Sequence, residues 1–158
     1  MRSNVIKTDS GLQIQEIVEG NGASPKVGDR VLINYILHLG TGVSSSNYDY
    51  DKLCYIDDQI DSTYEPPFNA PIEIFIGTET KKDALYSKGD SIAGISEALL
   101  GMRFGGKSRV LIPSELAYGV EGGSSFHTFH GYRTPPNRDL DMVIELVAPV
   151  VHEGENNE

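Results

Sequence analysis

Apolar and polar residues alternate along several short segments, with the period of two that is typical of β-strands. The clearest example is segment 31–39, in which Val31, Ile33, Tyr35, Leu37 and Leu39 share one face. The further strand candidates are segments 12–18, 72–76, 107–112 and 139–147. The pattern therefore predicts a protein built mainly from short strands.

One segment has the three- and four-residue spacing of a helix instead. Ile92, Ile95 and Leu99 recur on one face, Asp90 or Ser91 can cap the start, and Gly101 lies just past the end. Many strands and one short helix, without alternating β-α-β units, predict an α+β fold in which an antiparallel sheet packs against the helix.

The chain has 158 residues, of which 39% are apolar, and this composition fits one globular domain with a buried core. We place this domain at residues 11–148. Residues 1–10 are polar and are interpreted as a flexible N-terminal segment, and residues 149–158 as an acidic tail.

The balance of 13 Lys and Arg against 23 Asp and Glu gives a formal charge of −10, which argues against nucleic acid or an anionic membrane as a partner. The one cysteine, Cys54, cannot form an internal disulfide. No stretch approaches the roughly 18 apolar residues of a membrane span, and the first residues do not resemble a signal peptide. We expect a soluble monomer in the cytoplasm, with the nucleus as the second option.

Residues 101–108 match the phosphate-loop pattern G-x-x-x-x-G-K-[ST], with Lys107 at the lysine position. A phosphate loop needs a strand before the glycines and a helix after them, so that the helix N–H groups point at the phosphates. Here the predicted helix comes first, and a strand that Pro113 stops comes second. We interpret the segment as a turn and not as a nucleotide site.

Other motifs that suggest chemistry are incomplete. His127 and His130 are too few to form a zinc site. The acidic residues Asp49, Asp51, Asp57, Asp58 and Asp61 lack the glycine and closing glutamate of a calcium-binding EF-hand loop. Cys54 has no local partner, and the Gly-X-Ser-X-Gly pattern of hydrolases is missing. We therefore predict neither a metal nor a cofactor.

Several segments carry a more specific signal when they are taken together and in order. They are residues 28–35, 60–62, 71–77, 94–102 with the run to Gly119, and 135–146. At these residues the sequence resembles the FKBP family of peptidyl-prolyl cis–trans isomerases, and the resemblance extends from Gly11 to Val147. It implies a five- or six-stranded antiparallel sheet that curls around one short helix, with a shallow apolar pocket between them.

The resemblance also assigns the residues of that pocket. Tyr118 matches the tyrosine whose hydroxyl donates to a substrate carbonyl, and Asp61 matches the carboxylate beside the twisted amide. Ile92 matches the residue whose backbone N–H anchors a ligand carbonyl. The substrate-binding residues that the resemblance implies are Tyr35, Ile60, Ile72, Ser91, Ile92, Ile95 as the floor, and Met142.

Two features set this sequence apart from the usual family pattern. Ile60, Ile72, Ile95 and Met142 are aliphatic where the family has aromatic rings, so stacking on a prolyl ring is lost, and either weak activity or a different substrate is expected. For Ile72, Ile95 and Met142, ordinary core packing is the alternative to contact with a ligand. Insertions near residues 41–58, 81–89 and 123–132 flank the expected pocket.

The resemblance therefore predicts an isomerase that acts on X–Pro bonds and assists protein folding as a chaperone. The alternative is a non-enzymatic FKBP-like module that binds proteins or acts as a chaperone. The expected partners are proline-containing peptides or proteins and ligands of the macrolide immunosuppressant type.

Overall fold

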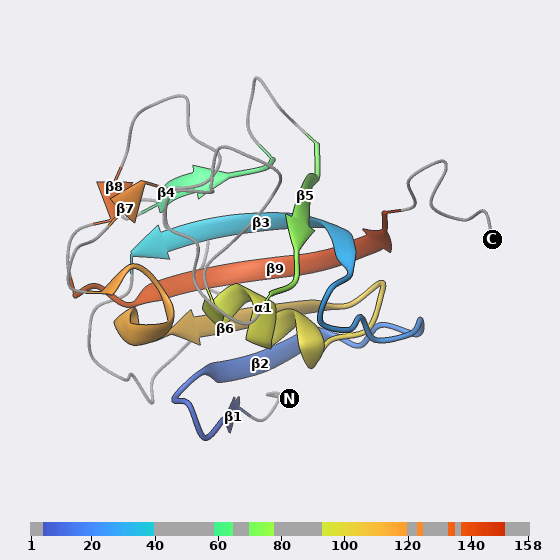
Figure 1. The fold of residues 1–158 in the computed structure, drawn as a ribbon, viewed down its shortest axis with the longest axis horizontal. Helices are drawn as coiled ribbons and strands as arrows, with labels where there is room; N and C mark the ends of the chain where they lie inside the picture. Colours follow the sequence, from blue (N-terminus) through green and yellow to red (C-terminus); the bar gives the residue numbers. More distant parts are fainter. Residues whose placement is uncertain are drawn as a thin grey trace.

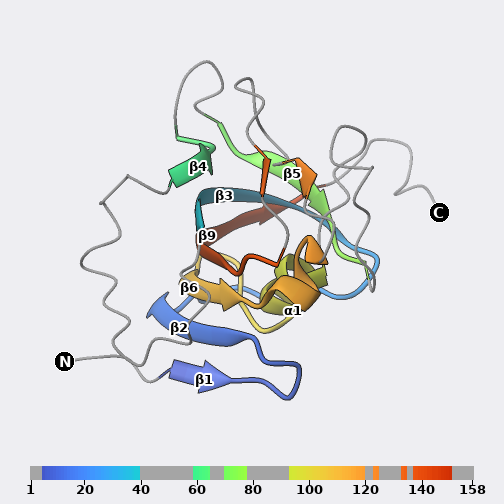
Figure 2. The same ribbon diagram turned by 90° about the vertical axis from the view of Figure 1, so that its left-hand side faces the viewer.

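A curved antiparallel sheet carries the short helix α1 on its concave face (Figure 1). The structure is a computed structural model that describes residues 5–39, 59–64, 70–77, 93–119, 123–124, 133–134 and 137–150. Figure 2 shows the sheet bending around the helix, with β3 and β9 on one side of it and β5 crossing above it.

The strands pair in an order that differs from their order in the sequence. The elements are β1 (Val5–Lys7), β2 (Gln13–Val18), β3 (Arg30–Leu39), β4 (Gln59–Ser62), β5 (Ile72–Phe75), α1 (Ala93–Leu100), β6 (Lys107–Ile112), a 3-10 turn (Ser114–Leu116), β7 (Gly123–Ser124), β8 (Arg133–Thr134) and β9 (Leu140–Pro149). The main sheet runs β1-β2-β6-β9-β3-β4, β5 also pairs with β3, and β7 pairs with β8 separately.

These elements confirm the predicted α+β fold. The predicted strands correspond to β2, β3, β5, β6 and β9, and the predicted helix corresponds to α1. The sequence pattern did not indicate β1 or β4. All three residues of β1 are exposed, so they show no alternation between a buried and an exposed face, and β4 is a strand of only four residues.

Strand β3 is paired along both of its edges and has three partner strands. Along one edge it pairs with β9 from Val31 to Leu39. The other edge pairs first with β5 and then with β4. Four alternate residues of β3 are fully buried: Val31, Ile33, Tyr35 and Leu37. The alternation in the sequence therefore corresponds to a strand face that packs into the core.

Helix α1 lies very close to the sheet at Gly94. A Cβ atom added to Gly94 would be 2.4 Å from Ile112 Cγ2 and 3.1 Å from the Leu116 carbonyl oxygen. A hydrogen bond of 3.1 Å from the Gly77 N–H to Ser96 Oγ ties the helix to the chain that follows β5. The helix is therefore held on the concave face by a close contact and by a polar contact.

The order of elements around residues 101–108 agrees with the interpretation of this segment as a turn. Helix α1 ends before it and β6 begins at Lys107, which is the reverse of the order in a phosphate loop. The insertions near 41–58 and 81–89, and most of the one near 123–132, lie outside the described residues. Within the residues that are described, no helix is long and apolar enough to cross a membrane.

We expect Gly94→Ala to destabilise the protein by about 1–3 kcal/mol, although alanine favours helices by about 1 kcal/mol over glycine. The added methyl group would overlap Ile112 Cγ2, and the helix would have to move away from β6. Urea denaturation followed by circular dichroism measures the change in the free energy of unfolding.

Gly101→Ala is the matched control, because its Cβ would meet only the Ala98 carbonyl oxygen, at 3.6 Å. We expect a change within about 0.5 kcal/mol for this variant. Equal losses at both glycines would contradict the explanation by packing.

Candidate functional site

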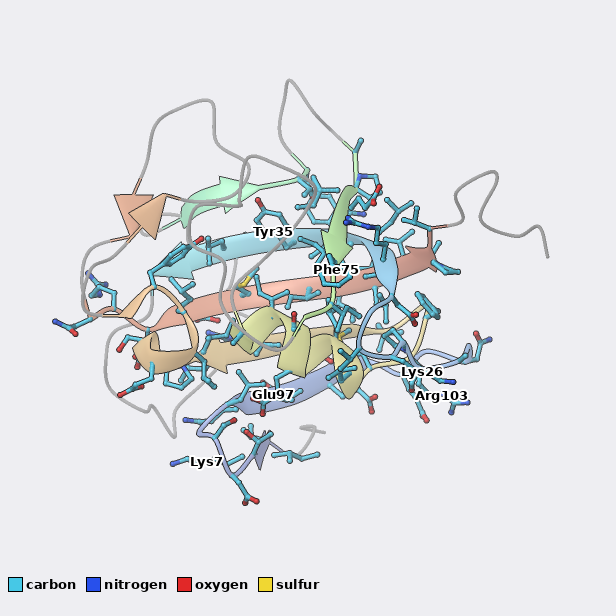
Figure 3. All side chains as sticks on the ribbon, in the orientation of Figure 1. Lys7, Lys26, Tyr35, Phe75, Glu97 and Arg103 are labelled. Carbon is cyan, nitrogen blue, oxygen red and sulfur yellow. The ribbon has the colours of Figure 1, made fainter. Side chains whose placement is uncertain are left out.

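Most of the predicted pocket residues whose side chains are described meet in one apolar cluster between α1 and the sheet. Tyr35 comes from β3, Ile95 from α1 and Met142 from β9, while Tyr118 follows the 3-10 turn. All four are 0% exposed. Ile72, the first residue of β5, is partly buried and packs against the same cluster. Figure 3 shows Tyr35 on β3.

Strand register places Asp61 in line with Met142. Met142 on β9 is the partner of Leu37 on β3, and Leu37 is in turn the partner of Asp61 on β4. Because neighbouring strands are about 4.8 Å apart, the Cα atoms of Met142 and Asp61 are about 10 Å apart across Leu37. Leu37 was not among the predicted site residues, although it belongs to the alternating pattern of segment 31–39.

The remaining predicted residues are described only in part. Leu37 pairs with Asp61 and His38 with Gln59, so Ile60 is an extra residue at a shift in the β3–β4 register. For Ile60 and Asp61 the structure describes the backbone. Ser91 and Ile92 lie outside the described residues, so their predicted roles stay predictions.

The turn that carries Tyr118 is held by the segment before β9. Pro113 ends β6, and the Ser114 N–H donates a 3.0 Å hydrogen bond to Asp139 Oδ1. Asn137 adopts a left-handed φ of 59°, which asparagine tolerates, and its N–H donates 2.9 Å to the Gly119 carbonyl. These two bonds fix the chain on both sides of Tyr118, whose hydroxyl lies in the interior.

An ion pair on the opposite face of the sheet joins β6 to β9. Arg109 donates from Nε to Asp141 Oδ1 at 3.0 Å and from Nη2 to Oδ2 at 2.7 Å. Their side chains are 9% and 16% exposed, so the pair is shielded from water. This bidentate geometry fixes the relative position of β9, which carries Met142, and of β6, which leads to Tyr118.

A second set of hydrogen-bonded polar side chains, formed by Asn34, Tyr64 and Glu145, lies beside the β3–β9 ladder. The Tyr64 hydroxyl donates a 3.1 Å hydrogen bond to Glu145 Oε1, which also accepts from Asn34 Nδ2 at 3.3 Å. Burial raises the pKa of Tyr64 from 10.0 to about 12, and the negative charge of Glu145 and its hydrogen bond act in the same direction. The folded protein therefore favours the protonated phenol.

The described residues also form an open groove of about 350 Å³ away from this cluster. Its lining residues are Lys7, Ser10, Gly11, Gln13, Leu111, Pro113, Glu115 and Asp139. None of the predicted site residues contributes to it. The described residues contain no group of three or more His, Cys, Asp or Glu side chains placed to hold a metal ion.

Comparison with known proteins gives a consistent result. The family profile described as FKBP-type peptidyl-prolyl cis-trans isomerase matches residues 22–147. FK506-binding protein 4 of Dictyostelium discoideum is 31% identical over 146 residues, and peptidyl-prolyl cis-trans isomerase FKBP16-1, chloroplastic, of Arabidopsis thaliana is 29% identical over 113 residues. The crystal structure of FkpA from Escherichia coli superposes with a TM-score of 0.63 at 27% identity.

The coverage of these matches is unequal. The match covers 92% of this chain for the Dictyostelium protein, 72% for the Arabidopsis protein and 92% for FkpA. The chain spans 30% of the Dictyostelium protein, 44% of the Arabidopsis protein and 51% of the FkpA chain. The relatives therefore have further regions that this chain does not match.

We expect Tyr64 to contribute stability below about pH 10 and to lose this contribution as the pH rises towards about 12. Its pKa is raised in the folded state, so unfolding is favoured once the unfolded phenol ionises and the folded one does not. The difference in the free energy of unfolding between the wild type and Tyr64→Phe, measured by denaturation at several pH values, should shrink over this range.

Glu145→Gln is the matched variant, because it removes the charge and keeps a hydrogen-bond acceptor beside Tyr64. Ultraviolet titration of this variant should show a tyrosine that ionises at a lower pH than in the wild type. Identical titration curves for the wild type and Tyr64→Phe near pH 12 would contradict the assignment.

Proposed function

The chain belongs to the FKBP-type peptidyl-prolyl cis–trans isomerase family, and we propose that it accelerates rotation about X–Pro bonds in peptides and proteins. The observation that carries the proposal is the coincidence of the family match with the core cluster in which Tyr35, Ile95, Tyr118 and Met142 meet. Relatives named as isomerases favour this activity over the alternative of a non-enzymatic binding module.

The reaction suits an apolar site, because no covalent bond to the protein is needed. Rotation about a peptide bond is opposed by a barrier of about 18–20 kcal/mol, which comes from amide resonance. The twisted transition state loses this resonance and with it part of the charge separation of the planar amide. A water-poor cavity that fits the twisted form therefore lowers the barrier by binding it more tightly than the ground state.

We assign the polar steps to two side chains. The Tyr118 hydroxyl would donate to a substrate carbonyl and hold the peptide in one orientation. The Asp61 carboxylate would lie beside the rotating amide, in the register position opposite Leu37. Ile95 and Met142 would contact the prolyl ring, with Tyr35 at the side, and the Ile92 N–H would anchor a second carbonyl.

The aliphatic floor has a consequence for the rate. An aromatic side chain in contact with another ring contributes about 0.5–1.5 kcal/mol beyond the burial of its area, and Ile95 and Met142 cannot supply this. Both are also 0% exposed, so a peptide reaches them only after the cluster opens. Weak activity follows from both effects, because part of the binding free energy is spent on the opening.

We also propose that the site binds macrolides of the FK506 type. The Dictyostelium relative is named an FK506-binding protein, and that ligand class would use the same apolar cluster as a substrate. The missing aromatic floor predicts weaker binding than an aromatic pocket gives. A role as a chaperone, a monomeric state and a cytoplasmic location stay predictions.

We expect the purified protein to speed isomerisation of a Leu-Pro or Phe-Pro test peptide above the uncatalysed rate. Tyr118→Phe should lower kcat/KM by about 2- to 10-fold, which corresponds to one lost hydrogen bond. Asp61→Ala should lower it as well. A protease-coupled assay or exchange NMR measures these rates.

Thr8→Val is the matched control, because it removes a side-chain hydroxyl that accepts the Leu12 N–H at the β1–β2 turn, away from the residues assigned to the site. Its kcat/KM should equal that of the wild type. A wild-type rate no higher than the uncatalysed rate, with no change in Tyr118→Phe and Asp61→Ala, would overturn the proposed function.

A further inference from the structure

One edge of β3 changes its partner in the middle of the strand. Residues Arg30 to Ile33 pair with β5, and residues Ile36 to His38 pair with β4. Tyr35 lies in the gap between these two pairings and is fully buried. Its backbone N–H and C=O therefore need hydrogen-bond partners that neither strand ladder supplies, since buried backbone groups are almost always paired.

Thr63 supplies both partners. Its backbone N–H donates a 3.0 Å bond to the Tyr35 carbonyl, and its hydroxyl accepts the Tyr35 N–H at 2.9 Å. In a regular antiparallel pair the second acceptor would be the Thr63 carbonyl. That carbonyl accepts the Ala70 N–H instead, at 3.1 Å, as the chain leaves β4 towards β5. The hydroxyl thus stands in for a backbone carbonyl.

Asn34 orients this hydroxyl. Thr63 Oγ1 is 2.9 Å from Asn34 Oδ1 and 3.4 Å from the Tyr35 carbonyl oxygen, so its single proton goes to the shorter contact. Asn34 in turn donates from Nδ2 to Glu145 on β9. The lone pair of the hydroxyl is thereby kept towards the Tyr35 N–H. Thr63 is 0% exposed, so water does not compete for these bonds.

We propose that Thr63 is a positioning residue of the isomerase site. Thr63 lies two residues after Asp61, and β4 is held to β3 through a short ladder with a register shift. The Thr63 bonds fix the end of this strand against Tyr35, and so fix the backbone of Asp61 relative to the core cluster. This inference rests on the proposed function, because it assigns a role within the same site.

The position of Thr63 predicts which kinetic constant depends on it. Ile95 on α1 and Met142 on β9 would contact the substrate, and neither has a hydrogen bond to Thr63. Tyr35, which Thr63 does bond, is also held by the β3–β9 ladder, where it pairs with Ile144. Asp61 would act on the twisted amide. Loss of the Thr63 hydroxyl should therefore lower kcat and leave KM nearly unchanged, because small displacements of a catalytic group chiefly affect the transition state.

The test compares Thr63→Val, which keeps the shape and removes the hydroxyl, with Thr63→Ser, which keeps the hydroxyl. We expect kcat to fall about tenfold in Thr63→Val, as for the loss of one buried hydrogen bond, and KM to change by less than about twofold. Thr63→Ser should retain kcat within about twofold of the wild type. In Thr63→Val the Tyr35 amide should also exchange with deuterium faster.

Thr8→Val is the matched control. The Thr8 hydroxyl also accepts a backbone N–H, from Leu12 at 3.1 Å, but it does so at the β1–β2 turn. Its kcat should not change. If Thr63→Val does not fold, Asn34→Ala provides a second route, because it keeps the Thr63 hydroxyl and removes the carbonyl oxygen that orients it, together with the bond to Glu145, and it should lower kcat by a smaller factor.

The outcomes separate the two proposals. If the wild type is active and Thr63→Val loses stability but keeps its kcat, the positioning role is wrong and the proposed function stands. A Thr63→Ser variant as slow as Thr63→Val would also overturn the role of the hydroxyl. A wild type without activity would refute the function itself.

Discussion

The pairing of β3 along both edges is the constraint on which the other features depend. One edge is occupied by β9 for the whole length of the strand, and the other is shared by β5 and β4. Because a residue and its cross-strand partner occupy the same face, this pairing determines which side chains meet on the concave side. It places Met142 beside Leu37, and Asp61 beside the same Leu37 on the other edge.

The helix completes the arrangement from the other side of the core. It brings Ile95 into the cluster, and the contact at Gly94 leaves no room for a larger residue. The Ser96 hydroxyl links the helix to the chain after β5, while the Thr63 hydroxyl links the chain after β4 to β3. In both places a buried hydroxyl accepts a backbone N–H where a regular ladder ends, so these two N–H groups stay paired inside the protein.

The sequence alone predicts the parts of this fold that bury one face. The alternation in segment 31–39 identifies β3 because every second side chain enters the core. β1 has three exposed residues, and β4 contains a register shift at Ile60, so neither produces a readable period. The family resemblance identified Tyr118, Ile95 and Met142 as site residues, but it did not identify Leu37 or Thr63. The place of Leu37 beside Asp61 depends on strand register. The contact of Thr63 with Tyr35 depends on a side chain that replaces a backbone group.

The pairing of β3 with β9 also determines how the chain folds. The residues it joins, such as Leu39 and Leu140, are about 100 positions apart in the sequence, so the central ladder closes a very long loop. Folds dominated by such distant pairings have a high contact order and fold slowly, on a scale of about milliseconds to seconds. The cluster that holds Tyr35 and Met142 needs this ladder, because Tyr35 and Met142 lie on its two strands. A protein proposed to speed a slow step in the folding of other chains therefore depends, for its own site, on joining residues that are about 100 positions apart.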